Sequence, residues 1–221
     1  MSLQHNLSVV EERIQKSCDR SNRRREEVAL IAVTKTHSIE TVKEAYDLGI
    51  RDFGENRVQE LIKKKELLPQ DIRWHMIGHL QSNKARYIAP FIHCIHSIDS
   101  IETAKELSKR AEQHSRTVDV LLEINVAGEA TKEGIAISEA QEFSRLIFEE
   151  AASLRTCGLM TIAPFEGNTE RIRPYFRELR TLRDKLKLRE LSMGMSSDFE
   201  VAIEEGATMI RIGSGLFGER V

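Results

Sequence analysis

Short runs of β-branched and other apolar residues alternate along the chain with longer, charged segments of helical period. The runs have the length and composition of buried strands. They cover residues 30–35, 50–54, 73–78, 92–98, 118–126, 154–162, 190–195 and 208–213. A helix is expected before the first of them, because Leu7, Val10 and Ile14 fall on one face of a helical wheel.

The segments between the runs have the start and stop signals of helices. Residues 38–49 keep helical spacing, with Ser38 as an expected cap at the start and Gly49 at the end. The same pattern predicts helices over 100–114 and 169–186. Pro174 weakens the first turn of the latter, because proline lacks the N–H that a helix interior needs.

Strands that alternate with helices predict a parallel sheet whose crossovers are helical. About eight such units in 221 residues favour a (β/α)₈ TIM barrel with an additional N-terminal helix. A doubly wound open sheet is the alternative. The few prolines are scattered and no Gly/Ser-rich stretch divides the chain, so residues 1–221 are expected to form a single domain.

Composition restricts the partners. The formal net charge is −2 and the isoelectric point is about 6.4. The chain therefore has no overall basic field for nucleic acid or an anionic membrane, and we expect neither as a partner. The basic runs at 20–25 and 63–65 are interrupted by or flanked with glutamates and lack interleaved aromatics, so they indicate solvated surface.

The cysteines and the N-terminus point to the cytoplasm. Cys18, Cys94 and Cys157 are odd in number and form no Cys-x-x-Cys pair, which argues against a disulfide framework and a thiolate zinc site. Charged residues follow the first methionine too closely for a signal peptide, and no run of about 18 apolar residues occurs.

Lys35 stands at the carboxyl end of the first expected strand, where barrel enzymes place their chemistry. One interpretation is a solvated loop lysine. The other is an amine in a half-desolvated mouth, where burial favours the neutral form that attacks aldehydes.

Two small-residue turns after the last two strands form a candidate anion site. Gly213 and Ser214 follow the final strand, and Met195 and Ser196 follow the strand before it. Backbone N–H groups in such turns bind phosphate in many barrels. Ordinary capped turns are the alternative for either one alone.

Arg211 lies within the last strand, where a permanent charge is costly unless something accepts its hydrogen bonds. A bound ligand would satisfy it. The alternative is a buried carboxylate partner such as Glu123 on the fifth strand.

The histidines do not predict a metal site. His75 and His79 are four residues apart, but a strand-like segment separates them and no glutamate follows His75 as in a zinc protease. His93 and His96 differ by an odd number, so on one strand they would point to opposite faces.

Several motifs resemble one known family when they are taken together. They are AVTKTH, FGENRVQE, RWHMIGHLQSNK, IHSIDS, GLMTIAP and LSMGMSSDFEVAIEEGATMIRIGSGLFG, which run from about Lys35 to Gly218. In this order they look like the pyridoxal phosphate homeostasis protein family, which is related to the barrel domain of alanine racemase. The chain departs from the family pattern at His37, where proline is usual, and at Met76, where many members have phenylalanine.

The resemblance implies a cofactor, pyridoxal 5'-phosphate, and a role for each site residue. Lys35 would form the aldimine with the cofactor aldehyde. Ser196, Gly213 and Ser214 would hold the phosphate, and Arg211 would face the pyridine nitrogen. The ring pocket would be lined by Asn56, His75 and Met195.

A guanidinium beside the ring nitrogen favours the unprotonated ring, which is a poor electron sink. Racemisation also needs a second acid or base, which alanine racemases supply as a tyrosine from a further domain. Only three residues follow Gly218, so we expect no such domain here, and Tyr46, Tyr87 and Tyr175 fall in expected helices.

We therefore expect a cytoplasmic, monomeric carrier that serves cofactor homeostasis by handing the cofactor to apoenzymes, without significant turnover. An amino-acid racemase-like enzyme and a Schiff-base aldolase of sugar phosphates are the alternatives.

Overall fold

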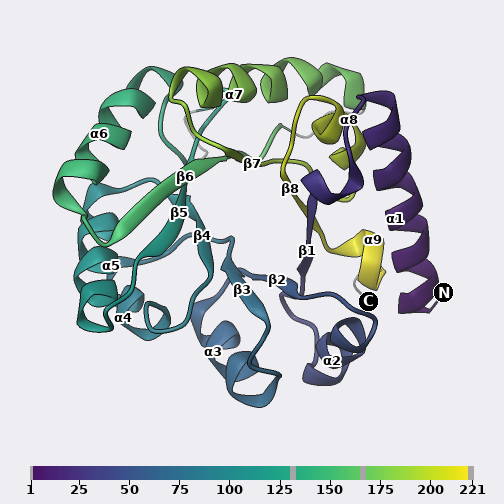
Figure 1. Cartoon of the computed structure of the whole chain (residues 1–221), viewed down its shortest axis with the longest axis horizontal. Helices are drawn as coiled ribbons and strands as arrows, with labels where there is room; N and C mark the ends of the chain where they lie inside the picture. The colour runs from purple at the N-terminus through teal and green to yellow at the C-terminus, as the bar shows by residue number, and fades with distance from the viewer. Residues whose placement is uncertain (1, 130–132, 165–167, 219–221) are drawn as a thin grey trace.

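The computed structural model describes residues 2–129, 133–164 and 168–218. Eight parallel strands pair in chain order, and β1 also pairs with β8, so the sheet closes into a barrel (Figure 1). The strands are β1 (Ala29–Val33), β2 (Asp52–Glu55), β3 (Arg73–Met76), β4 (Cys94–Ile98), β5 (Val118–Glu123), β6 (Leu154–Met160), β7 (Glu190–Ser192) and β8 (Met209–Ile212). Each lies within or close to a run expected from the hydrophobic pattern, so the barrel is confirmed and the open sheet is excluded.

Helices surround the barrel (Figure 1). They are α1 (Leu3–Arg20), α2 (Ile39–Asp47), α3 (Val58–Leu67), α4 (Ala85–Ile88), α5 (Ile101–Gln113), α6 (Ala140–Glu150), α7 (Arg173–Lys185), α8 (Phe199–Glu204) and α9 (Ser214–Phe217), with short 3₁₀ turns at Arg25–Glu27, Ser82–Lys84, Ile137–Glu139 and Thr169–Arg171. Their apolar faces pack on the outer side of the strands, as a parallel barrel requires. No helix of the described ranges is long and apolar enough to cross a membrane.

The expected helix signals operate as predicted. The Ser38 side chain accepts a hydrogen bond from the Thr41 N–H, and Ser100 caps α5 in the same way. Gly49 follows α2 with a φ of 102°, a conformation that favours glycine. Pro174 sits in the first turn of α7, so the segment from Thr169 is a 3₁₀ turn before the α-helix begins.

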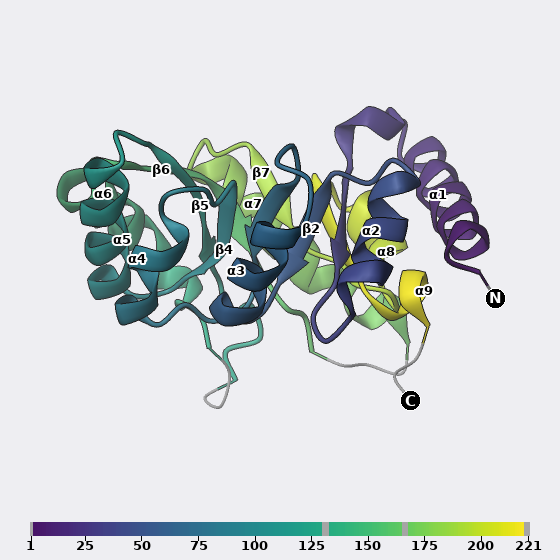
Figure 2. The same ribbon diagram turned by 90° about the horizontal axis from the view of Figure 1, so that it is seen from below.

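Helix α1 is additional to the eight β/α units and lies beside α8 and α9 (Figures 1 and 2). Asn6 Nδ2 donates to the Leu216 carbonyl at 2.8 Å, and Arg13 pairs with Glu200 at 2.9 Å. The expected N-terminal helix is therefore present, and it supports the two short helices that follow the predicted anion turns.

Candidate functional site

A pocket of about 430 Å³ opens at the carboxyl ends of the barrel strands. Its lining includes seven residues singled out from the sequence, namely Lys35, Asn56, Met195, Ser196, Arg211, Gly213 and Ser214. They come from strand ends and following turns that are far apart in the chain. The fold thus brings the lysine and both small-residue turns to one cavity, while the individual roles of these residues stay predictions.

His75 does not line this pocket, contrary to the expectation. It lies within β3, 2% exposed, with its side chain bonded to His96 and Asp52. Asp52, the first residue of β2, and His75 instead border a second cavity at the amino ends of the strands. Ile77, two residues later, lines the pocket at the carboxyl ends of the strands. The reason is depth in the barrel: side chains stack in layers, and His75 belongs to a layer below the mouth.

A strained turn presents Lys35. Strand β1 ends at Val33, Thr34 is buried, and Lys35 is half-buried in the turn that follows. The next residue, Thr36, has a φ of 70°, which is unfavourable for a β-branched side chain. Its N–H donates to Glu60 Oε1 at 2.7 Å, and this contact offsets part of the strain. Such strain persists only where the surroundings impose it, as they do at many functional sites.

Lys64 of α3 contacts the backbone of the same turn. Its Nζ donates to the Thr34 carbonyl at 2.6 Å and to Glu55 and Glu60 at 2.7 Å. The side chain is 3% exposed, so the expectation that residues 63–65 are all solvated surface is wrong for Lys64. Burial raises the pKa of Glu55, against the hydrogen bonds from Lys64 and Thr34. The (i, i+4) spacing of Glu60 and Lys64 was the available sequence signal.

One arginine of the basic run at 20–25, Arg23, also forms hydrogen bonds within the fold. Arg23 donates through NH1 to the carbonyls of Ile203 and Ala207, both at 2.8 Å. The arginine therefore satisfies backbone acceptors at the end of α8, instead of standing free on the surface.

The two anion turns contact each other directly. The Gly215 N–H donates to Ser196 Oγ at 3.1 Å, and the Arg211 N–H donates to the Gly194 carbonyl at 3.0 Å. Gly194 has a φ of 93°, and a Cβ there would lie 2.6 Å from Ala202. Glycine is therefore needed for the tight entry into α8, and the turns form one cradle of backbone and hydroxyl groups.

Arg211 is 5% exposed, and its guanidinium donates to Ser192 Oγ at 2.6 Å and to the Thr161 carbonyl at 2.8 Å. Glu123 is not an ion-pair partner, and within the described ranges no other carboxylate is either. Burial lowers the pKa of Arg211 to about 10, against the nearby charges of Asp198 and Glu123. A buried cation with neutral acceptors beside a pocket is suited to an electron-rich ligand group.

Two groups of side chains in the described part of the chain have the spacing of a metal site, and both include His75. They are His75 with Cys94 and His96, and Asp52 with His75 and His93, with ligand atoms within 4.8 Å. Both nitrogens of His75 already bond to His96 and Asp52, so we assign no metal. His93 precedes β4, so the strand alternation expected for His93 and His96 does not apply. The ring centroids of His93 and His96 lie 5.2 and 5.1 Å from that of His75.

Sequence reasoning missed several pocket residues. Val33, Ile77, Ile162 and Gly218 also line the cavity, together with His37, which departs from the family pattern, and Ser197, which continues the predicted turn after Ser196. Most follow or end a strand, and position after a strand is the signal that would have found them. Neither Ser192 nor the His96 ring was assigned a role, because their importance depends on what lies across the barrel.

Fold and site together define a class: a (β/α)₈ barrel with a lysine and two small-residue turns around one pocket at its mouth. The family model of the alanine racemase N-terminal domain matches residues 2–221. A curated relative in Aquifex aeolicus is 48% identical over 97% of this chain and 96% of its own length, and one in Escherichia coli is 38% identical over 98% and 96%. Both are named pyridoxal phosphate homeostasis protein.

Among solved structures, PipY of Synechococcus elongatus with pyridoxal phosphate bound is 36% identical. It has a TM-score of 0.83 and is matched over 98% of this chain and 100% of PipY. An alanine racemase of Clostridium difficile, 16% identical with a TM-score of 0.72, shares the fold. The chain belongs to the pyridoxal phosphate homeostasis protein family, within the alanine racemase N-terminal domain class.

Proposed function

We propose that this protein binds pyridoxal 5'-phosphate in the pocket at the carboxyl ends of the strands, as a Schiff base (aldimine) with Lys35, and serves cofactor homeostasis. The observation that carries the proposal is the convergence of Lys35, Arg211 and the two glycine–serine turns on one cavity. That cavity, of about 430 Å³, falls within the range of roughly 300–1,000 Å³ typical of small-molecule sites.

The residues present fit this cofactor. An amine, an anion cradle and a cationic donor match an aldehyde, a phosphate and a ring nitrogen. The buried Asn56 Oδ1 has no hydrogen-bond partner within the described residues, and Asn56 lines the pocket, so a bound ligand would relieve an otherwise costly orphan. When bound, the cofactor supplies an electrophilic aldehyde on a conjugated ring.

We propose further that the protein holds the cofactor without significant turnover. Arg211 donates hydrogen bonds only, so a ring nitrogen facing it would remain unprotonated and the ring would withdraw electrons weakly. The tyrosines supply no second acid at the pocket: Tyr46 bonds to Asp71, and neither Tyr87 nor Tyr175 lines the cavity in the described structure. A monomer in the cytoplasm that hands its cofactor to apoenzymes is the role that we propose for such a holder.

Replacing Lys35 by alanine tests the covalent assignment. The wild-type protein loaded with pyridoxal phosphate should show a visible aldimine band, and borohydride should fix the cofactor to the peptide that contains Lys35. Lys35→Ala should lose both signals, whereas Lys63→Ala, at an exposed lysine of α3, should keep them. Covalent cofactor in the Lys35→Ala variant would refute the assignment. Racemisation of a free amino acid faster than about 1 per second would favour the enzyme alternative.

A further inference from the structure

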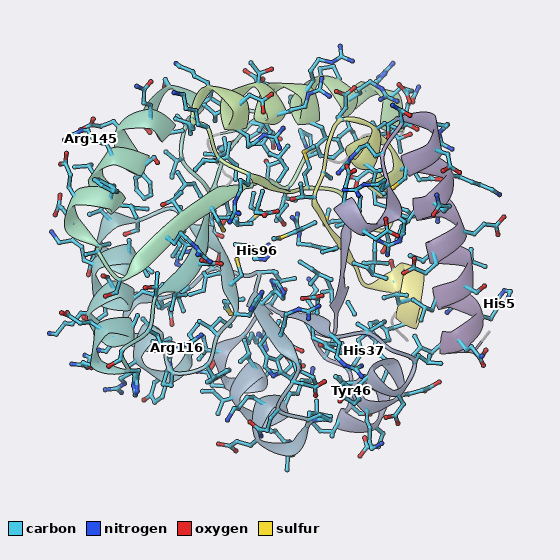
Figure 3. The ribbon with its side chains drawn as sticks, viewed as in Figure 1. His5, His37, Tyr46, His96, Arg116 and Arg145 are labelled. Carbon is cyan, nitrogen blue, oxygen red and sulfur yellow. The ribbon has the colours of Figure 1, made fainter. Side chains whose placement is uncertain are left out.

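A continuous row of polar side chains crosses the barrel interior below the pocket. Arg211 NH1 donates to Ser192 Oγ at 2.6 Å, and Ser192 Oγ lies 2.8 Å from His96 Nδ1. His96 Nε2 lies 2.9 Å from His75 Nδ1, and His75 Nε2 lies 3.0 Å from Asp52 Oδ1. Figure 3 shows His96 in the middle of the barrel. The row joins the pocket at the carboxyl ends of the strands to the amino ends.

Burial makes this row expensive unless all its members are paired. Ser192 and His96 are fully buried, and His75 is 2% exposed. Barrel interiors are ordinarily filled by branched apolar side chains, and an unpaired polar group there costs about 1–3 kcal/mol. The row satisfies its members only as a complete chain, so the groups at its two ends decide where the protons lie.

Both ends have fixed roles. Arg211 can only donate hydrogen bonds. Burial alone would raise the pKa of Asp52, but hydrogen bonds from Arg73 and His75 outweigh it and hold that pKa well below its ordinary value. Asp52 is therefore an ionised carboxylate that can only accept.

Only one arrangement of protons then satisfies every atom between these ends. The Ser192 hydroxyl donates to His96 Nδ1, His96 Nε2–H donates to His75 Nδ1, and His75 Nε2–H donates to Asp52. In the reverse direction the Ser192 hydroxyl would receive hydrogen bonds from both Arg211 and His96, and its own hydrogen would find no acceptor among the described side chains. Burial lowers the pKa of His96 well below its ordinary value, and the nearby Arg211 charge acts in the same direction, in keeping with a neutral ring.

We propose that Asp52 is a positioning residue for the cofactor pocket, acting through His75, His96 and Ser192 on Arg211. The carboxylate selects the Nε2–H tautomer of both imidazoles. With that selection the Ser192 hydroxyl donates to His96, and its oxygen accepts from Arg211 without a second donor competing for its lone pairs. The inference rests on the proposed function only in that Arg211 faces the cofactor; the proton arrangement is a property of the protein alone.

A second carboxylate offers a matched control. Asp119 is the second residue of β5 and is paired with Arg155 through two hydrogen bonds of 2.5 and 2.6 Å. Asp52 is paired with Arg73 in the same two-pronged manner, at 2.7 and 2.5 Å. Only Asp52 also contacts an imidazole. Asp52→Ala and Asp119→Ala therefore remove equivalent surface pairs, but only the first opens the row.

The experiment has two readouts on the full-length protein. The first is ¹⁵N NMR of histidine-labelled protein without cofactor, in which two-bond couplings report the tautomers. The wild type and Asp119→Ala should show Nε2–H at His75 and His96, and Asp52→Ala should show mixed tautomers. A wild-type spectrum with Nδ1–H or a charged ring at either position would overturn the inference.

The second readout is pyridoxal phosphate itself, through its visible absorbance and its dissociation constant. Asp52→Ala should shift the band and weaken binding about tenfold, the size expected for loss of one hydrogen bond to a charged group. Ser192→Ala, at the other end of the row, should also shift the band and weaken binding. This variant removes only a hydroxyl group, so it tests the row even if Asp52→Ala fails to fold.

The failures are distinguishable. Equal binding by Asp52→Ala, Ser192→Ala and Asp119→Ala, with normal binding by the wild type, would overturn this inference alone. A wild-type protein that takes up no pyridoxal phosphate would overturn the proposed function and, with it, the claim that Asp52 positions a cofactor contact. The NMR spectrum would then still decide the proton arrangement.

Discussion

At the scale of single residues, the site depends on groups that hold the reactive side chains in place. Lys35 projects from a turn in which Thr36 has a φ of 70°, and Glu60 and Lys64 bind the backbone on both sides of the lysine. Lys64 is held in this position by ion pairs with Glu55 and Glu60, both at 2.7 Å. Pre-organisation of this kind keeps an amine aimed into a pocket before a ligand arrives.

Replacing Lys64 by methionine should destabilise the fold and loosen this turn. The change keeps the length of the side chain but leaves Glu55 buried without its cation, at a cost of about 3–5 kcal/mol. Urea denaturation measures the loss, and the aldimine band should form more slowly. Lys63→Met, at the exposed neighbour on the same helix, should change stability by less than about 0.5 kcal/mol. Similar stability of the two variants would contradict the bracing role.

At the scale of elements, the close approach of β6 and β7 brings Thr161 and Ser192 together beneath Arg211. The Thr161 N–H donates to the Ser192 carbonyl at 3.1 Å, and both residues also contact the guanidinium. Gly158 permits this approach, because a Cβ there would lie 2.1 Å from the Glu190 carbonyl oxygen. The pairing of β5 with β6 shifts register near the same point, which is where a glycine bulge is expected.

Gly158→Ala should therefore separate β6 from β7. The clash involves backbone and cannot be relieved by a rotamer change, so we expect a loss of about 3 kcal/mol in the free energy of unfolding. The urea midpoint at unchanged slope measures it. Gly49→Ala is the control: its positive φ costs about 1 kcal/mol, but a Cβ there meets nothing within 4 Å. An equal or smaller loss at Gly158 would show that the strands can separate freely.

At the scale of the whole molecule, the barrel mouth combines positive and negative regions. Lys35 and Arg211 line the pocket, and the charges of Asp99 and Glu133 act on Glu123 at the end of β5. Burial, followed by the charges of Asp99 and Glu133, raises the pKa of Glu123 to about 7, against the attraction of Arg211. Because the folded pKa exceeds the unfolded value of about 4.5, the folded state binds this proton more tightly.

Stability should consequently fall as the pH rises from about 4.5 to 7, the interval in which the folded state holds a proton that the unfolded chain has lost. Glu123→Gln removes this dependence. The variant should match the wild type below about pH 4.5 and exceed it by about 2–3 kcal/mol above pH 7, at 1.36 kcal/mol per pKa unit with some solvent relaxation. Urea titrations across the pH range test this, with exposed Glu178→Gln of α7 as the control. A constant difference between Glu123→Gln and wild type would contradict the expectation.

The sequence by itself determined the β/α order, the helix caps at Ser38 and Ser100, and the turns that carry Lys35 and Ser214, because these depend on local periodicity and backbone chemistry. Only the tertiary structure decided the rest. It placed His75 a layer below the pocket, buried Lys64 under the Lys35 turn, and joined Asp52 to Arg211 through His96 and Ser192. The physical reason is that closing the barrel sets how deep each inward side chain lies and what it meets across the interior, and neither quantity has a signature in local spacing.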